Sequence, residues 1–318
     1  MRHSILIASM LGLATAAPAD VLEVPEDHAT IQGAINAASP GDTVSVAAGV
    51  WTEWISFRGK DIVVESRLGP EETTIDGGAA PSAVVFGHGE SRDAVLRGFT
   101  ITGGGGGTLF EGLRSGGGIY IHLASPTVES CIVRDCHAQM GGGVSIWEGD
   151  PHFIDVVVRD CQATVDGGGM RIHHLSHPLM QQCSFLGNAA TVHGGGLAYG
   201  NDSNGVHEAC VFEGNTAGIR GGGLSKSCDC SNAVISGTSM CNNTPDHILG
   251  TWDDLGGNDL CPECPYDVSA DGMIDANDLL AIIGAWGGCV CVEDLTGDSV
   301  VNVDDLLLIV ESWGLCPV

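Results

Sequence analysis

Positive charge is scarce in this chain of 318 residues. Lysine occurs only at positions 60 and 226, and Lys and Arg together number 12 against 40 Asp and Glu, which gives a net charge of −28. This charge argues against nucleic acid and anionic membranes as partners, because like charges repel. Aromatic residues make up only 5%, and no apolar run after residue 17 is long enough to span a membrane. We therefore expect no nucleic-acid partner and no membrane span.

The first 19 residues differ in character from the rest. A short basic start precedes an apolar stretch from Ile5 to Ala17, and Ala17-Pro18-Ala19 has the small–x–small pattern of a signal-peptidase site. The stretch is too short to cross a membrane. Residues 1–19 are therefore predicted to be a signal peptide. The mature protein is expected to be secreted, extracellular or on a bacterial cell surface.

Glycine, by contrast, is abundant, and its placement defines an internal repeat. Gly triplets begin at positions 116, 141, 167, 194 and 221, spaced by 25, 26, 27 and 27 residues. Alternating apolar and polar residues follow them, which is typical of a β-strand. An alanine column and an asparagine column keep the same spacing: Ala138, Ala163, Ala190 and Ala217, and Asn188, Asn215 and Asn243. Strands joined by such short turns are predicted to stack as a β-solenoid over residues 20–250.

The 13 cysteines also follow the repeat. In an exported chain they indicate disulfides, and the odd number leaves at least one without an intramolecular partner. Cys136 and Cys161 are one coil apart, as are Cys183 and Cys210, so each pair is expected about 4.8 Å apart at disulfide-compatible spacing. The alternative is that these residues stay thiols and pack as small apolar side chains.

Several segments resemble a known family, the pectin-lyase-like right-handed parallel β-helix proteins. The similar segments are residues 24–38, 41–53, 66–78 and 96–104. The resemblance covers about residues 22–250 and implies an all-β fold, a right-handed parallel β-helix with an N-terminal cap helix. Thr30 is placed to N-cap that helix, whose apolar side would close the open end of the solenoid.

The C-terminal region carries two calcium-loop patterns 27 residues apart. Oxygen-bearing side chains occupy loop positions 1, 3, 5, 9 and 12, and position 7 supplies a backbone carbonyl. The predicted ligands are Asp267, Ser269, Asp271, Met273, Asp275 and Asp278 in the first loop, and Asp294, Thr296, Asp298, Val300, Asn302 and Asp305 in the second. Position 6 is Gly272 in the first loop and Ser299 in the second, so the second site should be weaker. Ca²⁺ is thus the predicted cofactor.

Each loop leads into an apolar helix, over residues 279–286 and 306–313, and this arrangement resembles type I dockerin modules. The resemblance implies a small α-helical domain over residues 264–318, after a linker over residues 251–263. It also implies a cohesin-like or cell-surface anchoring partner. The chain departs from the family at loop positions 10 and 11, where Ser-Thr is common and this sequence has Ala276-Asn277 and Val303-Asp304.

The strands after the Gly triplets also predict a ligand face. Aromatic rings stack on sugar faces, and Arg pairs with uronate carboxylates. The predicted glycan face consists of Tyr120, His122, Trp147, Arg171 and His173. An anionic polysaccharide would require Arg171 and protonated histidines, and would bind more strongly near pH 6 than near pH 8.

No complete catalytic constellation is visible in the sequence. Gly49, Trp51 and Glu53 resemble a pectinesterase opening motif, but the later catalytic segments of that family are missing. The sequence favours a non-catalytic protein that binds extracellular polysaccharide and is attached through its calcium module. Two alternatives stay open: a polysaccharide lyase, glycoside hydrolase or esterase of the pectin-lyase-like group, and a structural adhesion spacer.

Overall fold

The computed structural model describes residues 18–110, 113–114, 116–226, 231–260, 266–269, 273–288, 293–296 and 300–315. Most of the predicted signal peptide lies outside these ranges. Over the ranges given, no helix has the length and apolar character needed to cross a membrane.

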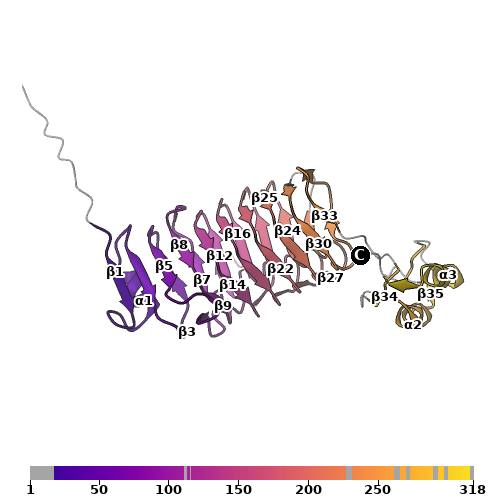
Figure 1. The fold of residues 1–318 in the computed structure, drawn as a ribbon, viewed down its shortest axis with the longest axis horizontal. Coiled ribbons are helices and arrows are strands. Elements are labelled where there is room, and N and C mark those ends of the chain that lie inside the picture. Colours follow the sequence, from indigo (N-terminus) through magenta and orange to yellow (C-terminus); the bar gives the residue numbers. More distant parts are fainter. Residues whose placement is uncertain are drawn as a thin grey trace, which may run out of the picture.

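Parallel β-sheets run side by side along the long axis of the molecule (Figure 1). Sheet 1 contains β1 (Val21–Val24), β2 (Thr43–Val46), β5 (Val63–Ser66), β8 (Val95–Arg97), β13 (Thr127–Glu129), β17 (His152–Ile154), β21 (Leu179–Gln181), β25 (Asn204–Glu208), β29 (Asn232–Ser236) and β32 (Asp253–Asp254). Sheet 2 contains β3 (Gly49–Thr52), β6 (Thr73–Asp76), β9 (Thr100–Thr102), β14 (Ile132–Arg134), β18 (Val157–Arg159), β22 (Ser184–Leu186), β26 (Val211–Glu213), β30 (Ser239–Cys241) and β33 (Asp259–Leu260).

The strands that follow the Gly triplets belong to a third sheet. Sheet 3 contains β4 (Ile55–Ser56), β7 (Val84–Phe86), β12 (Ile119–His122), β16 (Val144–Trp147), β20 (Met170–His173), β24 (Leu197–Gly200), β28 (Leu224–Lys226) and β31 (Ile248–Leu249). A short sheet at one corner contains β15 (His137–Ala138), β19 (Gln162–Ala163), β23 (Ala189–Ala190) and β27 (Thr216–Ala217), and β10 (Thr108–Phe110) pairs with β11 (Leu113–Arg114) as a hairpin. The predicted parallel β-helix is confirmed.

Apolar residues at alternate strand positions fill the interior of the solenoid. Ile119, Val144, Met170 and Leu197 pair in sequence across sheet 3, and all are buried. The glycine triplets are required where coils approach closely. A Cβ added at Gly168 would lie 2.4 Å from the carbonyl oxygens of Ala189 and Gly195, so that position admits no side chain.

The asparagine column forms a buried ladder between coils. Asn188 donates through its backbone and side-chain nitrogens to Oδ1 of Asn215, each at 3.0 Å, and Asn215 donates in the same way to Asn243. The side chain of Asn215 also donates to the carbonyl of Phe185 at 2.8 Å. Each amide therefore supplies hydrogen bonds to the coil before it and the coil after it.

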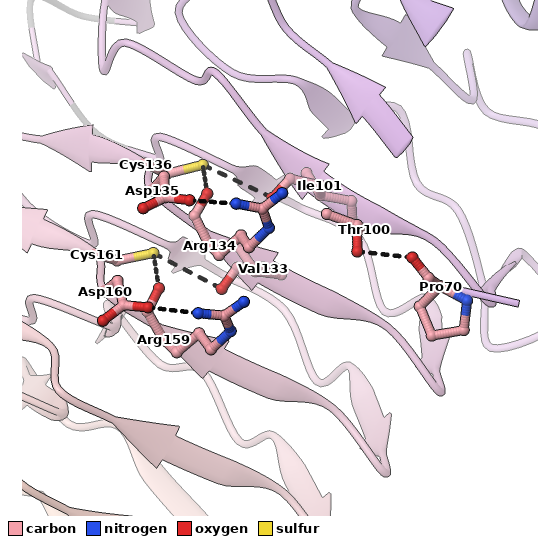
Figure 2. Close-up of polar contacts among 10 residues, drawn as sticks. All are labelled: Pro70, Thr100, Ile101, Val133, Arg134, Asp135, Cys136, Arg159, Asp160 and Cys161. Atoms are coloured by element: carbon pink, nitrogen blue, oxygen red, sulfur yellow. Dashed lines mark hydrogen bonds and ion pairs between the residues drawn. The ribbon is translucent and has the colours of Figure 1, made fainter. Parts of the chain in front are cut away.

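The inward-facing cysteines are thiols in this structure. Cys131, Cys136, Cys161, Cys183 and Cys210 are free and buried, so the alternative without disulfides at these positions is confirmed. Figure 2 shows Cys136 and Cys161 at equivalent places one coil apart, each donating to the carbonyl two residues earlier at 3.3 Å.

The same turn repeats on the outside of the coil. Arg134 donates to Asp135, and Arg159 donates to Asp160, each at 2.6 Å (Figure 2). Both aspartates have positive φ, a conformation that Asp tolerates better than most side chains. These partly exposed arginines are therefore already paired with their own neighbours.

Helix α1 (Ile31–Ala37) closes the N-terminal end. Its apolar residues Ile31, Ala34 and Ile35 are buried, and the Thr30 side chain accepts from the backbone N of Gly33, as predicted. Glu53 accepts from the backbone nitrogens of Ile31 and Gln32, each at 2.9 Å. Glu53 thus caps the helix, which gives the pectinesterase-like segment a structural role.

The C-terminal region contains α2 (Ala276–Gly284) and α3 (Val303–Glu311) with four two-residue strands: β34 (Met273–Ile274), β35 (Gly287–Gly288), β36 (Val300–Val301) and β37 (Gly314–Leu315). β34 pairs with β37, and β35 pairs with β36, so each repeat pairs with the other in the same way. Ile274, Ile282, Val301 and Ile309 form its buried core and also match at a 27-residue spacing.

The Asn ladder predicts a large loss of stability for one substitution. Asn215→Ala removes the acceptor for two nitrogens of Asn188 and the donor to Phe185, so we expect unfolding to become easier by at least about 2 kcal/mol. Urea denaturation followed by circular dichroism measures this. Glu213→Gln, at the exposed end of β26 two residues before Asn215, is the matched control, and an equal effect of both substitutions would contradict the ladder's role.

Candidate functional site

The residues of the predicted glycan face lie in register on sheet 3. Tyr120 pairs with Ser145 and then Arg171, and His122 pairs with Trp147 and then His173. These residues therefore form two adjacent columns across three neighbouring strands. We call His122, Trp147 and His173 the aromatic row.

The two columns differ in exposure, and this corrects the expected five-residue surface patch. Tyr120 and Arg171 point away from the core, but they are only 3% and 6% exposed. Ser145 and Ala198 in the same column are buried as well. Only the aromatic row is partly exposed, so direct stacking of a ligand is restricted to that row and the turn beside it.

Trp147 is the centre of a cluster of rings. Its ring centroid lies 4.6 Å from that of His173 and 5.2 Å from that of His174, and the interplanar angles are 36° and 34°. His174 lies in the turn after β20, and its Nε2 is 3.1 Å from Oε1 of Glu148. Neither His174 nor Glu148 belongs to the predicted glycan face, whereas the structure brings them to the edge of the row.

The charge state of His173 differs from the expectation. Burial, the nearby guanidinium of Arg171 and His174 together lower the pKa of His173 to about 4. His173 is therefore neutral at both pH 6 and pH 8. The structure therefore gives no support for protonation of His173 near pH 6 as a source of stronger anion binding.

Arg171 has an unusual set of contacts. Its Nη1 donates to the carbonyl of Tyr199 at 3.3 Å and lies 3.7 Å from Oδ2 of Asp166, while its Nε has no partner. Asp166 also accepts from the backbone N of His193 at 3.2 Å, and its Oδ1 lies 3.5 Å from Nδ1 of that histidine. Asp166 and His193 are not among the residues predicted from the sequence, although both directly precede Gly triplets.

The two predicted calcium loops share one geometry where they are described. In the first loop, Asp278 accepts from the backbone nitrogens of Ser269 and Asp275, each at 2.7 Å. In the second, Asp305 accepts from those of Thr296 and Asn302, at 2.9 and 2.8 Å. Burial opposes ionisation of both carboxyls, but these hydrogen bonds outweigh it and lower the pKa of each.

The carboxylate at position 12 of each loop therefore turns back over the loop and is held there in ionised form. Oxygen-bearing side chains of positions 1, 3 and 9 belong to the same short loop, and this donor set suits a hard cation such as Ca²⁺. The position-5 residues Asp271 and Asp298 lie outside the described residues. Over the residues that are described, no group of three or more His, Cys, Asp or Glu side chains is arranged to hold a metal.

No family model and no curated protein matches the sequence. Solved structures that match include a pectin methylesterase mutant in complex with a hexasaccharide and pectin methylesterase in complex with another hexasaccharide. Each aligns at 14% identity over 76% of this chain and 82% of that chain, with TM-scores of 0.34 and 0.31. Values this low carry no argument about activity or ligand, so the site must be judged by its own geometry.

The depressed pKa of His173 has a consequence for stability. Between about pH 4 and the ordinary histidine value of about 6.5, the unfolded chain binds a proton at this residue that the folded chain does not. Stability should therefore fall as pH decreases through this range. Between pH 7 and pH 5, the melting temperature of His173→Gln should therefore fall less than that of the wild type. An NMR titration that gives His173 a pKa near 6.5 would contradict the assignment.

Proposed function

We propose that this protein binds polysaccharide on the aromatic row of sheet 3 and is attached through a calcium-binding C-terminal module. The observation that carries the first part is the partly exposed cluster of Trp147, His173 and His174 on a parallel sheet. Aromatic rings on a rigid surface suit the apolar faces of sugars, because little order is lost when they bind.

The surroundings of the row support a sugar ligand. Leu123 directly follows His122 of the row and is an exposed apolar residue, and its backbone N donates to the carbonyl of Trp147 at 3.0 Å. Glu148 and His174 provide polar atoms at the same edge. Neighbouring coils are about 4.8 Å apart, so the row extends about 10 Å along the axis, enough for two or three sugar units. A polysaccharide would thus lie along the solenoid.

An enzyme of the pectin-lyase-like group is the second candidate. Asp166 beside Arg171 and His193 favours it, because a carboxylate, an imidazole and a buried cation could together move a proton on an acidic sugar. Assays for reducing ends, released methanol and unsaturated products, with His193→Ala as the test variant, decide between binding and catalysis. If the protein neither binds nor cleaves polysaccharide, the structural-spacer alternative remains.

The proposal for attachment rests on the C-terminal module. Once Ca²⁺ neutralises its loops, α2 and α3 would present matched apolar residues to a partner. Leu280, Ile283 and Trp286 are exposed, as are Leu307, Val310 and Trp313 at positions 27 residues later. Exposed apolar surface of this kind marks interaction sites. We infer an anchoring partner with an apolar docking surface, of the cohesin-like or cell-surface kind, outside the cell.

Removal of Trp147 tests the binding surface. We expect Trp147→Ala to weaken polysaccharide binding at least about tenfold, since an aromatic anchor at the centre of a contact commonly contributes 1–2 kcal/mol or more. A polysaccharide array followed by calorimetry on the best ligand measures the change. Trp54→Ala is the matched control, because Trp54 is 52% exposed but lies in the turn before β4. Equal binding by both variants would refute the site.

The calcium proposal predicts about two Ca²⁺ per chain. Asp267→Ala should reduce calcium binding more than Asp294→Ala, because the second loop has Ser299 where the first has Gly272. Calorimetry with CaCl₂ on the full chain measures both stoichiometry and affinity. Asp93→Ala removes an exposed carboxylate of the solenoid and serves as control. No calcium heat at millimolar metal would eliminate the proposed site.

A further inference from the structure

The aromatic row ends at Gly200, where the guanidinium of Arg171 occupies the position that a side chain would fill. In register, the row runs His122, Trp147, His173 and then Gly200 on β24. A Cβ added at Gly200 would lie 2.4 Å from Nη2 of Arg171 and 3.1 Å from its Cζ. The guanidinium of Arg171 therefore lies over Gly200, one coil beyond its own, and continues the row of rings.

This cation is buried without being fully neutralised. The Arg171 side chain is 7% exposed, and the closest carboxylate oxygen in an ion pair with it lies 3.7 Å away, beyond normal hydrogen-bonding distance. That carboxylate, on Asp166, is already engaged by the backbone N of His193. Nε of Arg171 has no partner. Burial of an incompletely paired charge is costly, so a functional reason for keeping it is expected.

The groups that face the guanidinium also favour a second anion. His173 beside it is neutral at physiological pH, so it neither competes for an anion nor repels one. Ser145 and Ala198, on either side of Arg171 in its column, are small and carry no charge. Asp166 is the opposing charge, and its contact with Arg171 is loose. An anion that reached the guanidinium could accept shorter hydrogen bonds from it than Asp166 does.

We propose that Arg171, placed by Gly200, forms an anion-binding subsite that recognises a carboxylate or sulfate group on the polysaccharide. The inference rests on the proposed function, because it assigns the charge of the ligand bound along the same row. Sugars stack on Trp147 and His173, and the anionic substituent of the next unit lies against the guanidinium. The subsite thus selects acidic over neutral polysaccharide despite the overall negative charge of the protein.

Calorimetry with matched ligands tests this selection. The probes are polygalacturonate, its fully methyl-esterified form, and a sulfated and an unsulfated form of one neutral polysaccharide. We expect the wild type to prefer the anionic member of a pair roughly tenfold or more, the range of a charge-assisted hydrogen bond. A preference in the first pair alone identifies carboxylate as the group recognised, and one in the second pair alone identifies sulfate.

Two variants remove the subsite by different routes. Arg171→Gln removes the charge, and Gly200→Ala places a methyl group where the guanidinium lies. Both should reduce the preference to about one, and Arg171→Lys should restore part of it. Arg134→Gln, which removes an arginine already paired with Asp135 on sheet 2, should keep the full preference. Circular dichroism and melting curves show whether each variant folds. If Arg171→Gln does not fold, Gly200→Ala is the variant compared with the wild type.

The possible outcomes separate the two proposals. If the wild type binds both members of each pair equally, or if both subsite variants keep the preference, the anion subsite is wrong and polysaccharide binding still stands. If the wild type binds none of these probes and no other polysaccharide on an array, the proposed function itself is wrong. Loss of the preference in both subsite variants but not in Arg134→Gln supports the assignment.

Discussion

Hydrogen bonding of each coil to the next, in parallel register, is the constraint on which the rest of this structure depends. Strands that stack about 4.8 Å apart place equivalent residues of successive repeats directly above one another. A side chain that is favourable in one coil is then favourable in the next, which explains the inward apolar columns and the Asn188–Asn215–Asn243 ladder. Glycine is needed where a Cβ would meet the carbonyl of a neighbouring coil, as at Gly168.

The same stacking explains how a binding surface can arise without a deep cleft. A column of outward residues becomes a continuous row, and its chemistry changes only where a repeat changes its residue. His122, Trp147 and His173 supply rings, and the next repeat supplies Gly200, which leaves space for Arg171. Because Gly200 has no side chain, the guanidinium of Arg171 from the neighbouring column occupies its place in the row. The preference for anionic polysaccharide that we infer follows from the presence of Gly200 where the preceding repeats have a ring.

The C-terminal module depends on a different source of order. Its buried core, over the residues that are described, consists of four apolar side chains with partly buried neighbours, which is little for an independent unit. The position-12 carboxylates Asp278 and Asp305 instead organise each loop around backbone N–H groups. A bound cation would extend this local order, because the same loop oxygens would share it. Its pairwise-matched strands and helices also explain why exposed apolar residues recur at a fixed spacing.

The sequence by itself determined the repeat, the strands and the register, because period-two alternation and constant spacing are local patterns that stacking preserves. The alternation after the Gly triplets corresponds to the buried column of Ile119, Val144, Met170 and Leu197, and the constant spacing of Asn188, Asn215 and Asn243 corresponds to the ladder. The alternation shows only on which side of a strand a residue lies, however, and not what covers it. Tyr120 and Arg171 therefore proved to be buried even though they point outward.

Only the tertiary structure decided the properties that depend on neighbours from other coils. The largest cause of the lowered pKa of His173 is burial, to which Arg171 and His174 of its own coil add, and the contacts of Asp166 with Arg171 and His193 join two repeats. Inside the solenoid, Tyr199 and His207 meet at 2.8 Å across two different sheets, a pairing that no alternation indicates. Electrostatic environment and burial are sums over residues distant in the chain, so they arise only when the coils are stacked.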